Sequence, residues 1–252
     1  MRISLIEELA KKGNIFNFEE ALKLSNVKED ILWVILSRLE KKGWIERIEK
    51  GKYMIIPLGA KKGEYTLHEF VIGSMLVKPY CISYWSALHF YGLTEQIPNT
   101  VFIQTPSRKK KQELVIFGVK YKIIRINNIK IFGVRKEWIE GKQIEIVDKE
   151  KCIIDCLDKP QYSGGIIEVV KALKNEKLDR TKLSKYAQQI GNTGAIRRLG
   201  YLCDYLKISI KLPDIITRNY LLVDPTMVNK GTKNSKWRLV INLNKEILGN
   251  LE

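Results

Sequence analysis

The chain has 252 residues, 45% of them hydrophobic, and carries 44 Lys and Arg against 28 Asp and Glu, a formal net charge of +16. This composition is typical of a globular protein with a buried core and excludes a disordered chain. No apolar run approaches the roughly 20 residues that cross a bilayer, and Glu7 and Glu8 interrupt the N-terminal segment too early for a signal peptide. The four cysteines are too few and too irregularly placed for a disulfide framework, so we expect free thiols in a cytoplasmic protein.

Two short helices are expected at the start of the chain. Leu5 and Leu9 share one face of the first helix, which Gly13 ends. Asn17, followed three residues later by Glu20, can cap a short second helix. These two helices would support the segment that follows.

Residues 25–53 predict a third helix followed by a hairpin. At about 100° per residue, the helix has an aliphatic side and an outer side. The aliphatic side carries Ile31, Leu32, Ile35, Leu36 and Leu39, and the outer side carries Asp30, Trp33, Val34, Ser37 and Lys41. Gly43 would close the helix as a left-handed cap, and strands at 44–48 and 52–56 would flank the turn 49–51.

Three helices and a hairpin within about sixty residues is the order of a winged helix-turn-helix domain. We place this domain at residues 1–60, with the third helix as the recognition helix and the hairpin as the wing. Winged helices bind DNA, but some bind protein, and that alternative stays open.

Most of the positive charge lies outside this domain. Residues 1–63 contain 13 Lys and Arg against 9 Asp and Glu, a net +4, whereas residues 64–252 contain 31 against 19, a net +12. Residues 106–136 contain a single acidic residue, Glu113, and ten basic residues: Arg108, Lys109, Lys110, Lys111, Lys120, Lys122, Arg125, Lys130, Arg135 and Lys136. Such a patch suits phosphates, since each one neutralised adds a salt-dependent contribution to binding. A lysine-rich surface that only keeps the protein soluble is the alternative.

Residues 57–63, with one proline, two glycines and two lysines, predict a junction to a second domain at 64–252. That domain should begin with helices at 66–76 and 83–91. The second of these helices is rich in aromatic residues, and we expect its His89 to be packed or hydrogen-bonded rather than a ligand or base.

The remainder of the second domain predicts a sheet followed by helices. Extended runs lie at 101–105, 114–117, 121–126, 129–132 and 143–147, and helical spacing follows at 149–158, 165–174, 181–189 and 195–206. Two extended segments, at 219–223 and 237–243, end the chain. The predicted fold class is α+β: an N-terminal winged helix-turn-helix, then a mixed C-terminal domain with an antiparallel sheet and several helices.

A series of short motifs marks the second domain. They are YCISYWSAL at 80–88 continuing to YGLTEQIP at 91–98, FGV at 132–134, VDKEK at 147–151 with Asp155 and Pro160, the pair Gly164-Gly165, IRRLGY at 196–201, and WRL at 237–239 before Asn242. In this order they resemble the AbiEi-type antitoxins of abortive-infection systems. Together with the winged helix, the resemblance covers nearly the whole chain.

The resemblance implies a transcriptional autorepressor and antitoxin from a phage-defence, toxin-antitoxin operon. Its partner molecule would be double-stranded DNA, namely repeat elements of its own promoter. Its functional partner would be a nucleotidyltransferase-like toxin, which such proteins counteract without a stable complex, and no membrane is implied. The C-terminal domain would provide the antitoxin activity and help to hold DNA.

Transferred by position, the outer side of the third helix would read bases, and the wing would meet phosphates or a minor groove. The DNA-binding residues are then Lys28, Trp33, Ser37, Arg38, Lys41, Arg47, Lys50 and Lys52. The basic patch of the C-terminal domain comprises Arg108, Lys109, Lys110, Lys111, Lys120, Lys122, Arg197 and Arg198. Trp33 is unusual for a groove, so packing on the second domain is the alternative for that side chain.

An enzyme is the main rival interpretation. Residues 148–151, Asp-Lys-Glu-Lys, resemble nuclease carboxylates with a lysine, but both acids begin a helix, where capping and the helix dipole explain them. Cys152 and Cys156 lie one helical turn apart without a second Cys or His pair to complete a metal site. We therefore expect no enzyme, no cofactor and no metal. The alternative function is a protein- or RNA-binding module that neutralises its partner by direct contact, with the winged helix as scaffold.

Overall fold

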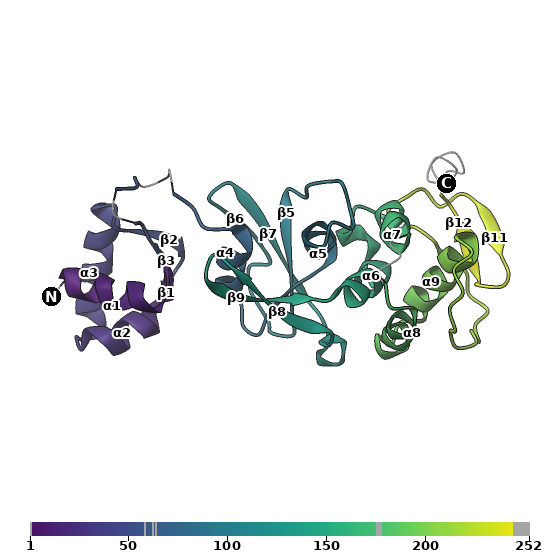
Figure 1. Cartoon of the computed structure of the whole chain (residues 1–252), viewed down its shortest axis with the longest axis horizontal. Coiled ribbons are helices and arrows are strands. Elements are labelled where there is room, and N and C mark those ends of the chain that lie inside the picture. Colours follow the sequence, from purple (N-terminus) through teal and green to yellow (C-terminus); the bar gives the residue numbers. More distant parts are fainter. Residues whose placement is uncertain (1, 58, 62, 64, 175–177, 244–252) are drawn as a thin grey trace.

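The computed structural model describes residues 2–57, 59–61, 63, 65–174 and 178–243. Figure 1 shows three lobes in a row: an N-terminal lobe of helices and a small sheet, a central lobe built on a larger sheet, and a C-terminal lobe of helices with a second small sheet. Residues 58, 62 and 64, where the expected junction falls, lie outside the described residues. The domain boundary at 60–64 therefore stays a prediction.

The N-terminal lobe has the winged helix-turn-helix arrangement. Its elements are α1 (Arg2–Lys12), β1 (Ile15–Asn17), α2 (Phe18–Ser25), α3 (Glu29–Lys41), β2 (Ile45–Glu49) and β3 (Lys52–Ile55), with the strands in the antiparallel order β1-β3-β2. Asn17 caps α2 as expected, because its side chain accepts a hydrogen bond from the Glu20 backbone N–H at 2.9 Å. Gly43 follows α3 with φ of 73°, the left-handed conformation that glycine adopts without strain.

A compact apolar cluster holds the three helices of this lobe together. Leu32, Leu36 and Leu39 of α3 are buried with Leu5 and Leu9 of α1. Two features differ from the sequence prediction. Strand β1 was not predicted, and Ile31, assigned to the aliphatic side, is 47% exposed.

The central lobe is organised by a six-stranded sheet in the order β6-β7-β5-β4-β9-β8. Its elements are α4 (Glu69–Leu76), β4 (Cys81–Ile82), α5 (Tyr84–Phe90), β5 (Thr100–Thr105), β6 (Glu113–Ile116), β7 (Val119–Arg125), β8 (Val134–Ile139) and β9 (Lys142–Val147). One face of the sheet packs on α4, where Gly73 lies close to the side chains of Ile82, Ile103 and Tyr121. Alternation along β5 and β7 then points Phe102 and Lys122 to the opposite face.

The α+β class is confirmed, but the sheet is mixed rather than antiparallel. Strand β7 inserts between β5 and β6 and runs parallel to β5, and β4 runs parallel to β9. The basic loop, residues 106–112, therefore carries the chain past the position of β7 to the edge of the sheet. The strand predicted at 129–132 is instead a 3-10 turn at Asn128–Lys130, begun by the Asn127 side chain, and β8 was missed.

The C-terminal lobe packs around α6 (Lys149–Asp158), which contacts α5 and the helices that follow it. These are η2 (Pro160–Tyr162), α7 (Ile166–Leu173), α8 (Arg180–Gln189) and α9 (Thr193–Tyr205), and the small sheet β10-β12-β11 comprises β10 (Leu221–Leu222), β11 (Thr232–Asn234) and β12 (Leu239–Ile241). The indole of Trp237 lies directly on Gly200 of α9, where a Cβ atom would come within 2.2 Å of the ring. Among the described residues, none of the helices combines the length and apolar character that crossing a membrane requires.

Candidate nucleic-acid interface

The outer side of α3 is accessible to solvent. Val34, Arg38 and Lys41 are exposed, and Ser37 is half-buried between them. Lys28, at the start of the helix, is also exposed, and its carbonyl accepts the Leu32 backbone N–H at 3.0 Å. The structure therefore places four of the predicted DNA-binding residues, Lys28, Ser37, Arg38 and Lys41, along an accessible helix.

Trp33 packs within the N-terminal lobe rather than on the second domain. Its ring stacks on Phe18, with centroids 4.2 Å apart and an angle of 16° between the planes. The Phe18 backbone N–H donates to the Gly51 carbonyl at 2.7 Å, so this aromatic pair joins α3, the start of α2 and the turn of the wing. The sequence prediction did not identify Phe18 as the partner of Trp33. The only signal was that Phe18 begins α2, the helix that precedes the helix of Trp33.

The three cations of the wing have different environments. Arg47 pairs with Glu40 of α3 at 2.8 Å, and its guanidinium lies over the Tyr53 ring at 5.8 Å from the centroid. Lys50 is exposed in the turn. Lys52 is half-buried and donates to Glu49 at 3.0 Å and to the Leu76 carbonyl at 2.9 Å. Only Arg47 and Lys50 thus remain on the surface of the wing, while Lys52 points toward the central lobe.

A group of four residues, here called the interlobe clamp, connects the wing to the central lobe: Glu49, Lys52, Lys109 and the carbonyl of Leu76. Lys109 Nζ lies 2.8 and 2.9 Å from the two carboxylate oxygens of Glu49 and 2.6 Å from the Leu76 carbonyl oxygen. Burial alone would raise the pKa of Glu49, but hydrogen bonds from Lys109 and Lys52 outweigh it and lower that pKa below its ordinary value of 4.5. The clamp therefore contains an ionised carboxylate between two ammonium groups.

Apolar contacts reinforce the clamp. Ile15, Ile48 and Met54 of the N-terminal lobe are buried in the same apolar cluster as Leu76 and Val77 of the central lobe. The two lobes consequently share a packed interface and are not separate bodies on a linker.

The basic loop lies beside the wing because Lys109, in its middle, belongs to the clamp. Its other cations, Arg108, Lys110 and Lys111, are exposed. Lys120 is exposed on β7, and the neighbouring Lys122 pairs with Glu113 at 2.6 Å. The predicted patch is thus divided: one lysine fixes the lobes, one is paired across the sheet, and four cations remain on the surface.

The prediction that Arg197 and Arg198 belong to this surface is wrong. Their residues are 2% and 7% exposed, and both side chains point from α9 to backbone carbonyls. Arg197 donates to the carbonyls of Trp237 at 2.9 Å and Asn219 at 2.7 Å, and Arg198 donates to those of Val223 and Leu157, each at 2.9 Å. Each guanidinium supplies five N–H donors, which suits it to gather carbonyls from several segments. These arginines attach the small C-terminal sheet to the helices.

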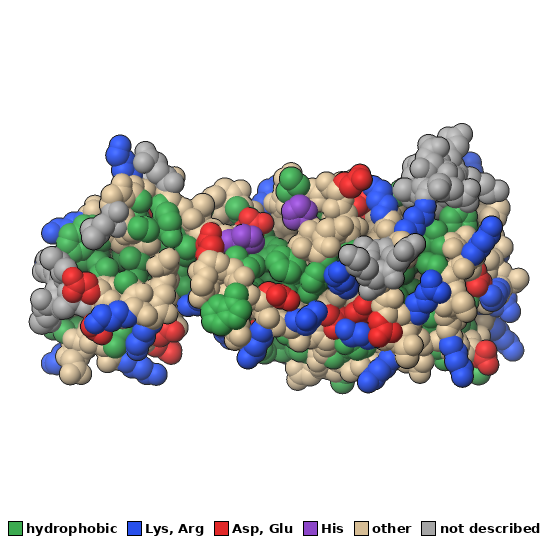
Figure 2. Space-filling model, in the orientation of Figure 1, with side chains coloured by type: hydrophobic (Ala, Val, Ile, Leu, Met, Phe, Trp, Pro, Cys, Tyr) green, Lys and Arg blue, Asp and Glu red, His purple; other side chains and the backbone are tan. Residues whose placement is uncertain are grey.

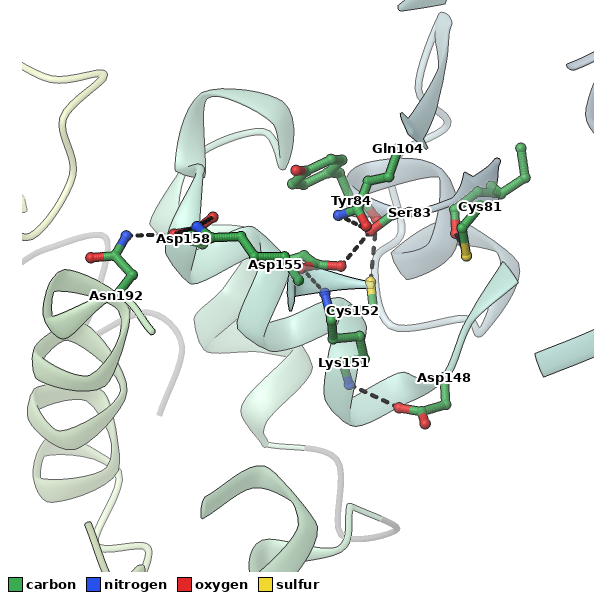
Figure 3. Close-up of polar contacts among 12 residues, drawn as sticks. Cys81, Ser83, Tyr84, Gln104, Asp148, Lys151, Cys152, Asp155, Asp158 and Asn192 are labelled. Carbon is green, nitrogen blue, oxygen red and sulfur yellow. Dashed lines mark hydrogen bonds and ion pairs between the residues drawn. The ribbon is translucent and has the colours of Figure 1, made fainter. Parts of the chain in front are cut away.

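The motif at 147–151 lies in a buried polar network (Figure 3). Asp148 caps α6 by accepting the Lys151 backbone N–H at 2.9 Å. Asp155, 2% exposed, lies between the ammonium of Lys151, which is fully buried, and the hydroxyl of Ser83, which donates to it at 2.8 Å. Burial raises the pKa of Asp155, and Lys151 only partly opposes this shift. The network joins α6 to the segment before α5 and is closed to solvent, so its acids occupy structural positions.

Other motif residues also serve packing. Gly133 has φ of 63°, and a Cβ atom there would lie 2.9 Å from the Cβ of Lys151, while its carbonyl accepts the Asp148 backbone N–H at 2.7 Å. Gly164 lies against the Trp85 indole, and a Cβ atom at this position would lie 2.9 Å from the ring. His89, in contrast, is exposed, so the prediction that it is packed was wrong. On the face drawn in Figure 2, Lys and Arg are spread over all three lobes and interspersed with Asp and Glu.

Comparison with known proteins supports the interpretation of the N-terminal lobe. Residues 4–56 match the family described as "Transcriptional regulator, AbiEi antitoxin", which confirms the predicted resemblance. Among solved structures, the RV2827C protein from Mycobacterium tuberculosis is similar in fold: the TM-score is 0.68 at 15% sequence identity, over 98% of this chain and 93% of that one. No curated protein matches the chain in sequence.

Proposed function

We propose that this chain, whose N-terminal lobe matches AbiEi-type transcriptional regulators, is a DNA-binding autorepressor and antitoxin. Its α3 helix enters the major groove of its own promoter, with Ser37, Arg38 and Lys41 facing the base edges and Lys28 facing a phosphate. The exposed Ile31 and Val34 on the same helix suit contact with thymine methyl groups.

The observation that carries the proposal is the attachment of the basic loop to the wing that follows α3. The clamp holds Lys109 against Glu49 of the wing, and its chain neighbours Arg108 and Lys110 are exposed, as is Lys50 in the turn of the wing. A duplex in contact with α3 would meet these cations on its flanking phosphates. This explains why much of the positive charge lies outside the winged helix.

A titration with labelled duplexes tests the proposal. We expect the full chain to bind a duplex of its own promoter at least tenfold more tightly than a scrambled duplex of the same composition, and the binding constant to fall steeply with salt. Lys41→Ala should reduce this preference, whereas Lys185→Ala, which removes an exposed lysine from α8 in the C-terminal lobe, should not. Equal affinity for the two duplexes would contradict sequence-specific repression.

The antitoxin part of the proposal rests on the family match and concerns a nucleotidyltransferase-like toxin. Co-expression with the protein encoded next to this chain should restore growth that the neighbour alone arrests. Rescue should persist in Lys41→Ala when expression is driven from an unrelated promoter, because repression and neutralisation use different parts of the chain. If no rescue occurs while promoter binding is intact, the chain is a repressor without antitoxin activity.

A second candidate function is supported by the outer side of α3 itself. Glu29 and Asp30 open the helix, and Ile31 and Val34 expose apolar surface beside them. Acidic and apolar side chains suit a protein partner better than a phosphate backbone. A stable stoichiometric complex with the neighbouring gene product, lost in Ile31→Asp, would favour this function over DNA binding.

A further inference from the structure

Two hollows lie at the β5-β7 part of the central lobe, away from α3. The larger, of about 840 Å³, is lined by the open face of β5, β6 and β7, including Phe102, Lys120 and Lys122, together with Tyr162. The smaller, of about 500 Å³, lies at the end of β7 and is lined by Arg125, Asn127, Asn128, Lys130 and Lys159. The larger hollow shares Lys111, Lys120 and Lys122 with the predicted basic patch, but neither hollow is lined by a residue of α3 or the wing.

Tyr162 connects the two hollows. Its ring lies in the larger one, with Lys122 Nζ at 5.4 Å and Lys159 Nζ at 6.0 Å from the ring centroid, and Lys159 also lines the smaller one. Phe102 and Tyr84 support the ring from within the lobe, at centroid distances of 5.9 and 5.4 Å. An aromatic ring held by two others, with one ammonium toward each hollow, forms the centre of what we call the Tyr162 track.

The charges along the track are mostly positive. Two of its lysines are paired, Lys122 with Glu113 at 2.6 Å and Lys130 with Asp158 at 2.7 Å. Lys111, Lys120 and Arg125 are exposed at its ends, and Lys159 is half-buried at its middle. Lys120 and Lys122 lie about 7 Å apart along the open face of β7, at about 3.3 Å per residue, whereas alternation gives Arg125, at the end of the strand, the opposite face. The cations of the track thus lie on the open face and around the end of the strand, about 17 Å from Lys120 to Arg125, a length that several nucleotides would span.

We propose that the Tyr162 track binds a single-stranded polynucleotide, with one base stacked on Tyr162 and the adjoining phosphates on Lys159 and Lys122. Lysine side chains are long and rotatable, so a base can replace an ammonium over the ring while that ammonium turns to a phosphate. A duplex keeps its bases stacked inside and cannot present one to Tyr162. An aromatic side chain between cations on the face of a sheet is suited to bind single-stranded RNA or single-stranded DNA.

Fluorescence anisotropy with the full chain and labelled 12-nucleotide oligo(U) and oligo(dT) tests this proposal. Tyr162→Leu keeps an apolar side chain against Phe102 but removes the ring, so we expect both oligonucleotides to bind roughly tenfold more weakly. Tyr162→Phe keeps the ring and should retain the affinity within about twofold. Thermal melts would verify that both variants remain folded. Tighter binding of oligo(U) would identify RNA as the strand, and equal binding would show that the sugar is not read; both results support the track.

A charge-matched pair of double variants separates the track from general attraction to a basic protein. Lys122→Gln with Lys159→Gln should reduce the salt dependence of oligonucleotide binding by about 1.4 on a log-log plot, since each phosphate contact on a single strand contributes about 0.7. Lys185→Gln with Lys207→Gln, on the C-terminal lobe, should leave it unchanged. Promoter-duplex binding is read separately, because it should respond to Lys41→Ala and not to Tyr162→Leu. Oligonucleotides that bind wild type and Tyr162→Leu equally, or that lose as much affinity in the control pair, would overturn the proposal.

Discussion

Replacing Glu49 with Gln should loosen the interlobe clamp. The change removes the negative charge that faces Lys109 Nζ at 2.8 Å and Lys52 Nζ at 3.0 Å, and leaves two ammonium groups sharing the Leu76 carbonyl. The side chains of Lys109, Lys52 and Glu49 are 13%, 24% and 25% exposed, so the cost should fall between that of a surface pair and that of a buried pair. We expect about 2 kcal/mol, which corresponds to a shift of roughly thirtyfold in the equilibrium between docked and undocked lobes.

Energy transfer between dyes on the two outer lobes measures this docking. The described cysteines at 81, 152, 156 and 203 are buried, so Lys23→Cys on α2 and Lys185→Cys on α8 provide selective labelling sites. Glu49→Gln should broaden the distance distribution, whereas Glu8→Gln, which breaks an exposed pair with Lys11, should not. If Glu49→Gln gave the same distribution as wild type, the clamp would not hold the lobes.

The clamp should also respond to acid. Because the pKa of Glu49 in the folded chain is lowered, its contribution is fully present above the ordinary pKa of 4.5 and is lost as the pH falls through the lower folded value. The wild-type distribution should therefore broaden only below pH 4.5. In Glu49→Gln this acid transition should be absent.

The remaining predictions concern the buried network, the contact on α9 and the recognition helix. Asp155→Ala leaves the Lys151 ammonium buried without its partner and should lower the free energy of unfolding by about 3–5 kcal/mol in denaturant titrations, while Lys151→Met with Asp155→Leu should recover most of the loss. Gly200→Ala should destabilise the fold by about 1–3 kcal/mol because its methyl group would displace Trp237; a gain from the higher helix propensity of Ala would show that the indole moves freely. Arg38→Ala with Lys41→Ala should weaken promoter binding by at least tenfold in anisotropy titrations without changing the melting temperature. Lys23→Ala, on α2, serves as the control, and an equal loss of binding in that variant would indicate that a different surface faces the DNA.

The N-terminal lobe could be predicted from sequence because its signals are local. Helical period, the Asn17 cap and Gly43 each specify structure within a few residues, and all appear as expected. Ile31 was misplaced because a helix whose buried side is narrow leaves flanking positions exposed, and periodicity alone does not give that width. The resemblance to AbiEi-type regulators is confirmed for residues 4–56, whereas the motifs at 80–242, on which it was based, lie outside the matched residues and stay a prediction.

The central and C-terminal lobes were less predictable because long-range pairing decides them. Strand periodicity found β5, β6, β7 and β9, but nothing local shows that β7 lies between β5 and β6. The same limit explains the errors in the candidate site: a lysine or arginine in a sequence reads as surface charge, whereas Lys109 bridges two lobes and Arg197 binds carbonyls about 40 residues distant in sequence. Whether a lysine or arginine lies on the surface therefore depends on its hydrogen-bond and ion-pair partners, which the sequence does not give.

Hydroxyl-radical footprinting of the full chain on its own promoter tests the central claim most directly. We expect a protected site in which the backbone near the α3 contact is flanked by further protected phosphates, and the flanking protection should disappear in Arg108→Ala with Lys110→Ala while the centre remains. A promoter that shows no protected site at protein concentrations that saturate the duplex would contradict recognition by α3.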